Sequence, residues 1–274
     1  MTWTCRLAAM LLLAALPGAG AGAASPIDDL LRAYPDALAG FDGSDLIWRD
    51  GTRMPVDDGR PDKSPEDQLR RGSILDQMRV AYPVAATLPP EQDPGRVRNR
   101  AFFTKMYGDC RAGEVVPKLA RVVWLPKTWG HAVSITSVNG VDRRLAEISR
   151  ELDELPPADK KYLYPVGGTY VCRTVADTGQ TSMHGWGAAI DINPNRSEYW
   201  LWRRAGGHGP DYVNSIPQDI VTIFERHGFI WGGRWAHFDT MHFEYRPELL
   251  GTEAKADVDR PGLRDAPAGA SGGE

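Results

Sequence analysis

The sequence predicts an α+β fold in which a small, mainly antiparallel sheet is flanked by helices. Two segments show amphipathic helical periodicity, and short runs rich in β-branched and aromatic residues lie around them, each bounded by turn residues. Such an interleaved order, without an internal repeat, favours a single α+β domain over a solenoid or propeller. The chain has 274 residues, 42% hydrophobic and 25% charged, which is enough for one substantial core or two small ones.

Residues 1–24 are predicted to be a secretory signal peptide. Arg6 precedes the apolar run LAAMLLLAAL, which is followed by Pro17 and the small-residue stretch GAGAGAAS. The run is short for a membrane span, and no later segment approaches about 18 consecutive apolar residues. We therefore expect cleavage after Ala23 or Ala24, export, and no stable membrane insertion afterwards; an uncleaved N-terminal anchor is the alternative.

The cysteines indicate the redox compartment of the protein, and the charge argues against one class of partner. Once the signal peptide is removed, Cys110 and Cys172 are the remaining cysteines, and in an oxidising compartment they would form one disulfide. Two unrelated buried thiols are the alternative. The formal net charge of −4 and the lack of a basic stripe argue against a nucleic-acid partner.

The two ends of the mature chain differ in character from its middle. Residues 25–100 are rich in Asp, Arg, Pro and Gly, and their one hairpin signal is DLIWRDGTRMPV, with Asp50 and Gly51 as a favoured two-residue turn. We expect an irregular N-terminal extension that packs on the main domain, residues 101–250. Residues 251–274 lack apolar periodicity, which predicts a disordered tail.

The first helix is predicted in VDRRLAEISRELDELPP. Its apolar residues follow one another at steps of three, four and three, which forms one helical face, and two prolines end it. The residues of this face are Leu145, Ile148, Leu152 and Leu155.

A second helix is predicted in SIPQDIVTIFERHG. Ser215 is the expected N-cap, Pro217 lies in the first turn and Gly228 marks the stop. The residues expected to face inward are Ile220, Ile223 and Phe224.

Four short runs are predicted as strands: ARVVWL, GTYVCR, AAIDIN and MHFEY. In AAIDIN, alternation sends Ile190 and Ile192 into the core and Asp191 to the opposite face. His184 lies seven residues before Asp191, too far away along a straight strand, so only a turn can bring the two together. Gly185 and Gly187 supply the permissive backbone for that turn.

A histidine nitrogen and a carboxylate oxygen that converge in this way are ligands that zinc accepts, and a tetrahedral site with one water needs one more. Of the six histidines, His242 in HFDTMHFEY is the best third candidate. Asp239, three residues earlier, is placed to act as general base. Residues three apart on a regular strand face opposite ways, so this role requires a bend between Asp239 and His242.

These motifs carry a resemblance to a known family. SMHGWGAAIDIN resembles the S-x-H-x-x-G-x-A-x-D signature of the M15 zinc metallopeptidases, which include D-alanyl-D-alanine carboxypeptidases and L-alanyl-D-glutamate endopeptidases that cut bacterial cell-wall peptides. WGGRWAHFDTMHFEY is similar to the second motif of the family, and the resemblance spans about residues 164–247. It implies a Hedgehog/DD-peptidase-like fold, peptidoglycan stem peptides as substrates, and a periplasmic or extracellular location in the bacterial cell envelope.

The resemblance also implies roles for single residues. His184, Asp191 and His242 would hold one Zn²⁺, and Asp239 would be the catalytic base. Arg173 matches a family arginine that would stabilise the oxyanion or hold a substrate carboxylate; a buried salt bridge is its alternative role. Many relatives have glutamate at the position of Asp239, and the shorter side chain is familiar in the endopeptidase-like branch of the family.

Four further residues are weaker candidates for contacts to substrate or ligands. Ser182 fills the family's serine position, although general turn preferences favour a turn or cap role over a substrate contact. Glu244 shares a strand face with His242 and could orient it. His237 could polarise a carbonyl or lie at the rim of the site, and Trp235 could line a groove, whereas Trp231 is expected in the core.

Two other functions compete with a peptidase. A catalytically silent, zinc-containing cell-wall binding module could share the fold, but such a module can lose its general base, and an acid stands at position 239. A polysaccharide-binding wall protein without zinc would require the two motifs to be coincidental. The sequence leaves open the scissile bond and the oligomeric state.

Overall fold

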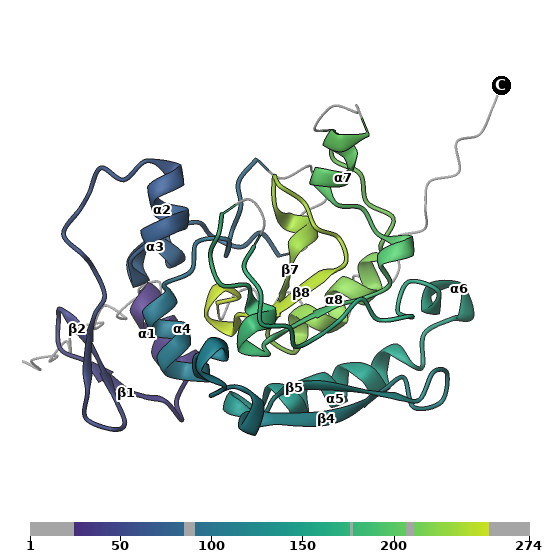
Figure 1. Cartoon of the computed structure of the whole chain (residues 1–274), viewed down its shortest axis with the longest axis horizontal. Helices are drawn as coiled ribbons and strands as arrows, with labels where there is room; N and C mark the ends of the chain where they lie inside the picture. Colours follow the sequence, from purple (N-terminus) through teal and green to yellow (C-terminus); the bar gives the residue numbers. More distant parts are fainter. Residues whose placement is uncertain (1–24, 85–90, 176–177, 207–210, 252–274) are drawn as a thin grey trace, which may run out of the picture.

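The protein combines three small antiparallel sheets with helices packed around them, which confirms the predicted α+β class (Figure 1). The computed structural model describes residues 25–84, 91–175, 178–206 and 211–251. The predicted signal peptide and nearly all of the predicted tail lie outside these residues. Within the described residues, none of the helices has the length and apolar character needed to cross a membrane.

The sheet that positions the candidate site has three strands. In it, β8 (His242–Tyr245) lies between β6 (Ala189–Asp191) and β7 (Phe229–Trp231), and both pairings are antiparallel. Ile190 and Ile192 are fully buried, as the alternation of AAIDIN predicts. Because Asp191 and His242 are direct partners across β6 and β8, their side chains leave the sheet on the same face.

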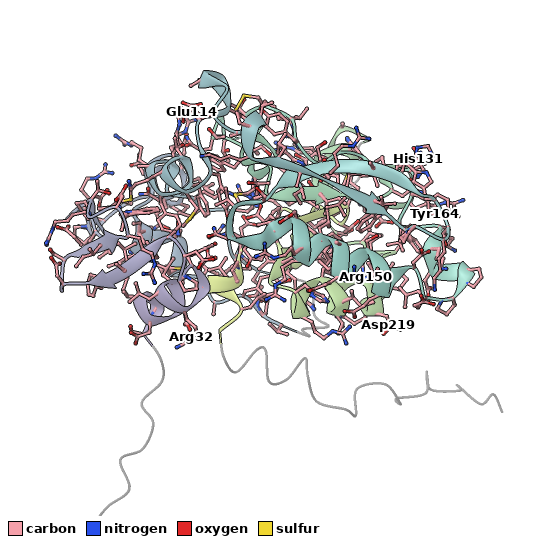
Figure 2. All side chains as sticks on the ribbon, turned by 90° about the horizontal axis from the view of Figure 1, so that it is seen from below. Arg32, Glu114, His131, Arg150, Tyr164 and Asp219 are labelled. Atoms are coloured by element: carbon pink, nitrogen blue, oxygen red, sulfur yellow. A yellow bond between two sulfur atoms is a disulfide. The ribbon has the colours of Figure 1, made fainter. Side chains whose placement is uncertain are left out.

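A two-stranded hairpin and two helices enclose the other side of the core. The hairpin pairs β4 (Leu119–Trp124) with β5 (His131–Thr136), and α5 (Val141–Leu152) packs on β4. The helix α8 (Gln218–Arg226) packs on β7 and stacks Phe224 against Phe243 of β8, with ring centroids 3.8 Å apart. Side chains fill the interior between these elements, whereas charged groups such as Arg32 and Glu114 lie at the periphery (Figure 2).

Both predicted helices are present. Leu145, Ile148 and Leu152 of α5 are fully buried, and Leu155 packs against the same core. The prediction for the start of the second helix was wrong, because Pro217 and not Ser215 occupies the N-cap position of α8, without a side-chain hydrogen bond to the helix. Ser215 instead hydrogen-bonds the carboxylate of Glu198. The serine that the local pattern assigned to the cap thus hydrogen-bonds a residue of another segment of the chain.

One predicted strand does not form. GTYVCR makes only an isolated bridge from Gly168 to Asp191, and its neighbour Thr174 makes another to Thr181. Its backbone is held by other contacts, including hydrogen bonds from Val171 N to His184 O and from Ser182 N to Arg173 O. The disulfide between Cys110 and Cys172 forms as predicted and also ties this segment down.

The N-terminal extension packs on the rest of the chain and contains more regular structure than its composition indicates. Most of its buried apolar residues belong to one cluster with residues of the segment 101–250, and Tyr82 belongs to a second cluster around Ile230 and Trp235. Helices begin after Ser25, Ser64 and Ser73, each of which accepts a backbone hydrogen bond as N-cap. The elements are α1 (Pro26–Ala33), β1 (Leu38–Phe41), β2 (Asp45–Trp48), β3 (Arg53–Pro55), α2 (Pro65–Arg71), α3 (Ile74–Met78) and, at its boundary, α4 (Arg100–Tyr107).

The predicted hairpin in the extension is β2 paired with β3, and β1 adds a third strand on the other side of β2. Gly51 adopts a φ of 82° in the connecting turn, a conformation that glycine tolerates. In Figure 1 this sheet lies at one end of the molecule, beyond α1 and α4. Two short helices complete the fold, α6 (Pro157–Lys160) and α7 (Trp200–Ala205).

Candidate metal centre and catalytic pocket

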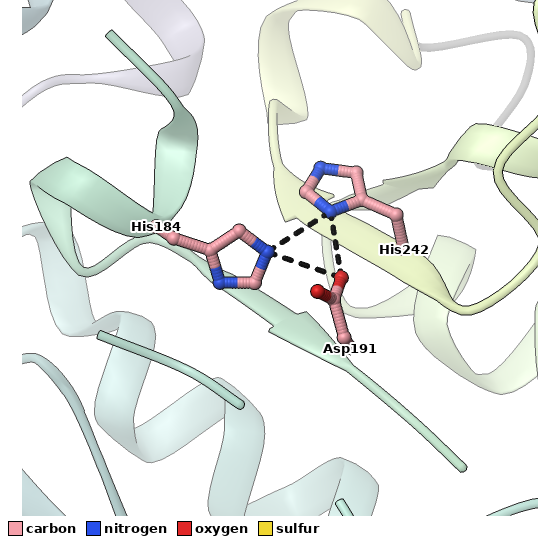
Figure 3. A group of neighbouring side chains, drawn as sticks. All are labelled: His184, Asp191 and His242. Carbon is pink, nitrogen blue, oxygen red and sulfur yellow. Dashed lines mark hydrogen bonds and ion pairs between the residues drawn. The ribbon is translucent and has the colours of Figure 1, made fainter. Parts of the chain in front are cut away.

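Three side chains predicted to bind a metal converge on one point (Figure 3). His184 Nε2 lies 3.0 Å from Asp191 Oδ1, His242 Nδ1 lies 2.9 Å from the same oxygen, and the two ring nitrogens are 3.2 Å apart. Both histidine side chains are buried, and Asp191 is largely so. The sequence therefore identified a set of three donors that the fold brings together.

Local backbone geometry delivers His184 to the strand pair. His184 lies in a 3₁₀ turn, η4 (Met183–Trp186), that starts at Ser182, whose Oγ accepts a hydrogen bond from His184 N at 3.3 Å. Gly187 ends this turn with a φ of 68°, and its N–H donates to His184 O. A Cβ at Gly187 would come within 2.9 Å of Leu119 Cδ2, so both the conformation and the space favour glycine here.

Hydrogen bonds on the far side of each ring fix which nitrogen faces the centre. His184 Nδ1 lies 2.5 Å from the Thr169 carbonyl oxygen, and His242 Nε2 lies 2.9 Å from Glu244 Oε2. Because both partners are acceptors, these nitrogens carry the hydrogens. The lone pairs of His184 Nε2 and His242 Nδ1 therefore point at each other and at Asp191 Oδ1.

This arrangement calls for a shared cation. Two nitrogen lone pairs and a carboxylate oxygen repel one another at these distances unless a proton or a metal ion lies among them. Two histidine nitrogens and one carboxylate oxygen form a donor set typical of catalytic zinc sites, which leave a further position open. The residues thus fit a zinc ion.

The pKa values of Asp191 and His242 are consistent with a cation among the three donors. Burial alone would raise the pKa of Asp191, but the charge and hydrogen bond of His184, together with the hydrogen bond of His242, hold it well below its usual range. Burial would lower the pKa of His242, but hydrogen bonds to Asp191 and Glu244 outweigh this and raise it to about 9. The centre favours positive charge between its donors.

Asp239 lies beside this centre in the bend that its predicted role requires. His242 N donates to Asp239 O at 3.2 Å, so the chain turns between the two residues before β8 begins. The residue is half-buried, but its Oδ1 is inaccessible to solvent and has no hydrogen-bond partner among the described residues. Burial, followed by the charge of Asp191, raises the pKa of Asp239 to about 7. A carboxylate kept in this state can accept a proton near neutral pH.

A cavity of about 280 Å³ opens over these groups. Asp191, Asp239 and His242 form part of its lining, Arg173 borders it, and α7 contributes Trp200 and Trp202. Arg173 is exposed, and its guanidinium makes no ion pair with any described residue, so the structure does not support a buried salt bridge as its role. Arg173 also borders a second cavity, of about 350 Å³, next to the disulfide.

The weaker candidates occupy different positions around the cavity. Ser182 is buried and acts as the cap of η4, although it also reaches the cavity wall. His237 lies at the rim and pairs its Nδ1 with Asp93 Oδ2 at 2.7 Å. Trp235 is buried, with its ring 5.5 Å from that of His242. Trp231 belongs to the core, as expected.

A buried chain of charged groups behind His242 was not foreseen from the sequence, apart from Glu244. Arg98 and Arg246 both bind the carboxylate of Glu244. Arg246 Nε also donates to Glu248 Oε1 at 2.5 Å, and the Tyr34 hydroxyl donates to Glu248 Oε2 at 2.6 Å. The charged run around Arg98 and the alternation of charges after His242 are the only sequence signals of this network.

His184, Asp191 and His242 offer three donor atoms to a metal ion, and the carboxylate of Asp239 lies beside them. Such an arrangement can serve metal-dependent hydrolysis. The comparison with known families agrees: residues 176–245 match the family model described as D-alanyl-D-alanine carboxypeptidase. The match supports an M15 peptidase and covers all three donors and Asp239. Neither the curated proteins nor the solved structures gave a match.

Proposed function

We propose that the protein is a zinc-dependent peptidase that hydrolyses peptide bonds in peptidoglycan stem peptides, acting as a D-alanyl-D-alanine carboxypeptidase or an L-alanyl-D-glutamate endopeptidase. The observation that carries this proposal is the convergence of His184, Asp191 and His242 beside Asp239, in one cavity and within the segment that matches the peptidase family. A silent binding module would have no need for a carboxylate at position 239 whose buried Oδ1 lacks a hydrogen-bond partner among the described residues.

In this proposal His184 Nε2, Asp191 Oδ1 and His242 Nδ1 hold one zinc ion. Bound zinc lowers the pKa of a coordinated water to about 7 and polarises a carbonyl oxygen. The Asp239 carboxylate accepts a proton from the attacking water and then passes it to the leaving amine. The Arg173 guanidinium, at the edge of the same cavity, stabilises negative charge on the substrate carbonyl or holds a substrate carboxylate.

The proposed location is the bacterial cell envelope, either periplasmic or extracellular. The N-terminal signal pattern and the disulfide between Cys110 and Cys172 support export to an oxidising compartment.

The test is to incubate the mature protein with defined muropeptides, with and without a zinc chelator, and to identify the products by mass spectrometry. Zinc-dependent release of a terminal D-alanine would identify a carboxypeptidase, and cleavage between L-alanine and D-glutamate an endopeptidase. Bound zinc without cleavage of any muropeptide would contradict the proposal and favour the silent binding module.

Replacing Arg173 with alanine is expected to lower turnover by about 10²-fold, the typical effect of removing one donor that stabilises an oxyanion. Zinc content should stay at the wild-type level, because Arg173 touches none of the three donors. Arg111→Ala is the matched control, since Arg111 is exposed beside the same disulfide but does not line the metal cavity. Loss of zinc from the Arg173 variant, measured by elemental analysis, would show a structural role instead.

A further inference from the structure

We infer that Arg98, in the N-terminal extension, is a positioning residue for the metal ligand His242 and acts on it through Glu244. This inference rests on the proposed function in one respect only, namely that His184, Asp191 and His242 hold zinc. Arg98 lies outside residues 176–245, so the family match assigns it no role.

Glu244 is the link between Arg98 and His242. Its side chain is fully buried, and its Oε2 accepts hydrogen bonds from both His242 Nε2, at 2.9 Å, and Arg98 Nη2. Its Oε1 accepts from Arg98 Nε at 3.3 Å and from Arg246 Nη1 at 3.2 Å. Arg98 therefore holds both oxygens at once, which fixes the plane of the carboxylate.

The fixed carboxylate in turn fixes the ring of His242. As long as Glu244 Oε2 accepts the Nε2 hydrogen, Nδ1 is the nitrogen that faces the centre and can offer its lone pair to a bound metal ion. Arg98 and Arg246 place two guanidinium groups against Glu244, so the buried carboxylate has the partners that an anion needs away from water. Without Arg98, the carboxylate would lose the partner that binds both of its oxygens, while Arg246 would still contact Oε1.

The side chain of Arg98 is itself held in place from a second direction. Its guanidinium carbon lies 5.9 Å from the centre of the Trp235 ring, and Trp235 packs against His242. The Trp235 indole N–H donates to the carbonyl of Pro94 at 2.6 Å, close to Arg98 in the chain. The ring that shields the metal ligand is thus tied to the same segment as Arg98.

The segment before Arg98 approaches the sheet too closely for an ordinary side chain. Gly95 has a φ of 85°, and a Cβ there would lie 2.5 Å from Ile230 Cδ1 and 3.0 Å from Leu249 Cδ1. The Gly95 carbonyl accepts from Arg246 Nη1 at 2.8 Å. The close packing of Gly95 and its hydrogen bond to Arg246 therefore fix the position of residues 93–98 beside the site.

The experiment measures zinc affinity by competition with a chromogenic chelator for wild type, Arg98→Gln and Arg98→Lys. Arg98→Gln should weaken zinc binding about 10- to 100-fold, the usual effect of losing an outer contact to a metal ligand. Arg98→Lys keeps the charge but not the two-pronged geometry, so its affinity should lie between the two. Arg100→Gln is the matched control, because Arg100 is exposed and belongs to no part of the site.

Two additional measurements separate positioning from general stabilisation. Glu244→Gln should also weaken zinc binding, and adding Arg98→Gln to it should cause little further loss, because both act through one path. The visible spectrum of the cobalt-substituted protein should change in Arg98→Gln even at full occupancy, since the ligand geometry changes; a merely structural role would leave that spectrum unchanged. Circular dichroism checks folding, and if Arg98→Gln does not fold, Arg98→Lys carries the test.

The outcomes are distinct from those of the proposed function. Wild-type zinc affinity in Arg98→Gln, or in Arg98→Lys where the glutamine variant does not fold, would overturn the inference while leaving the peptidase possible. If the fold-losses of zinc affinity caused by Arg98→Gln and Glu244→Gln multiply in the double variant, the two residues act independently and the inference is also overturned. Zinc binding weakened as expected, in a protein that cleaves no muropeptide, would support the inference and reject the peptidase. A wild type that binds no zinc would reject both.

Discussion

Replacing His184, Asp191 or His242 with alanine is expected to remove both the bound zinc and all measurable peptidase activity. Each residue supplies one of three donor atoms that lie within 4.8 Å of one another, and two donors hold zinc far more weakly than three. The loss of affinity should exceed the roughly 10- to 100-fold that follows from losing an outer contact. Elemental analysis after dialysis and muropeptide cleavage measure the two effects.

The matched control for these variants is His131→Ala. His131 is an exposed histidine on β5, at the edge of the molecule in Figure 2, and it is neither one of the three donors nor part of the cavity lining. This variant should keep wild-type zinc and activity. A protein that lost any one of the three donors and still held one zinc per chain would refute the assignment of the ligands.

The ligand set could be predicted from the sequence because short-range rules determine most of its geometry. Alternation in a strand separates Asp191 from Ile190 and Ile192, and Gly187 permits the turn that returns His184 to the strand. The bend at Asp239 followed from the incompatibility of a three-residue spacing with a regular strand. The one long-range element, the choice of His242, came from its aromatic-flanked segment and the nearby Asp239, and the family resemblance then implied the same residue. The pairing of Asp191 with His242 across β6 and β8 was not predicted.

The supporting contacts could not be predicted in this way. Arg98 and Glu244 are 146 residues apart, and no periodicity links them. The carbonyl of Thr169, which orients His184, belongs to a segment whose composition suggests a strand that does not form. Backbone acceptors and buried ion pairs depend on tertiary packing, which a local pattern does not encode.

The extension illustrates the same limit. Its polar composition does not indicate the short helices and strands that form there. Each of them contributes only a few apolar residues to a core that is shared with the rest of the chain, so no long apolar pattern arises. Serine caps at Ser25, Ser64 and Ser73 were the available signals for its helices. Since residues 93–98 reach the cavity and Glu244, the family-matching segment contains the proposed chemistry but not all of its support.

Asp239→Asn is expected to lower turnover by about 10²- to 10⁴-fold while zinc remains bound, because the change removes the proton acceptor but none of the three donors. The unfolding midpoint should be unchanged or higher, since a neutral amide costs less to bury than a carboxylate whose Oδ1 lacks a partner. Kinetics with muropeptides, elemental analysis and thermal unfolding measure the three quantities.

Asp239→Glu is the matched variant, because it keeps the carboxylate and lengthens its reach by one methylene. It should recover part of the activity that the asparagine variant loses, since glutamate can still accept a proton. A change of cleaved bond in this variant, read from the products, would link the length of the base to the choice between exopeptidase and endopeptidase. Full activity in Asp239→Asn would instead mean that another group accepts the proton, and the unpaired Oδ1 would then need a different explanation.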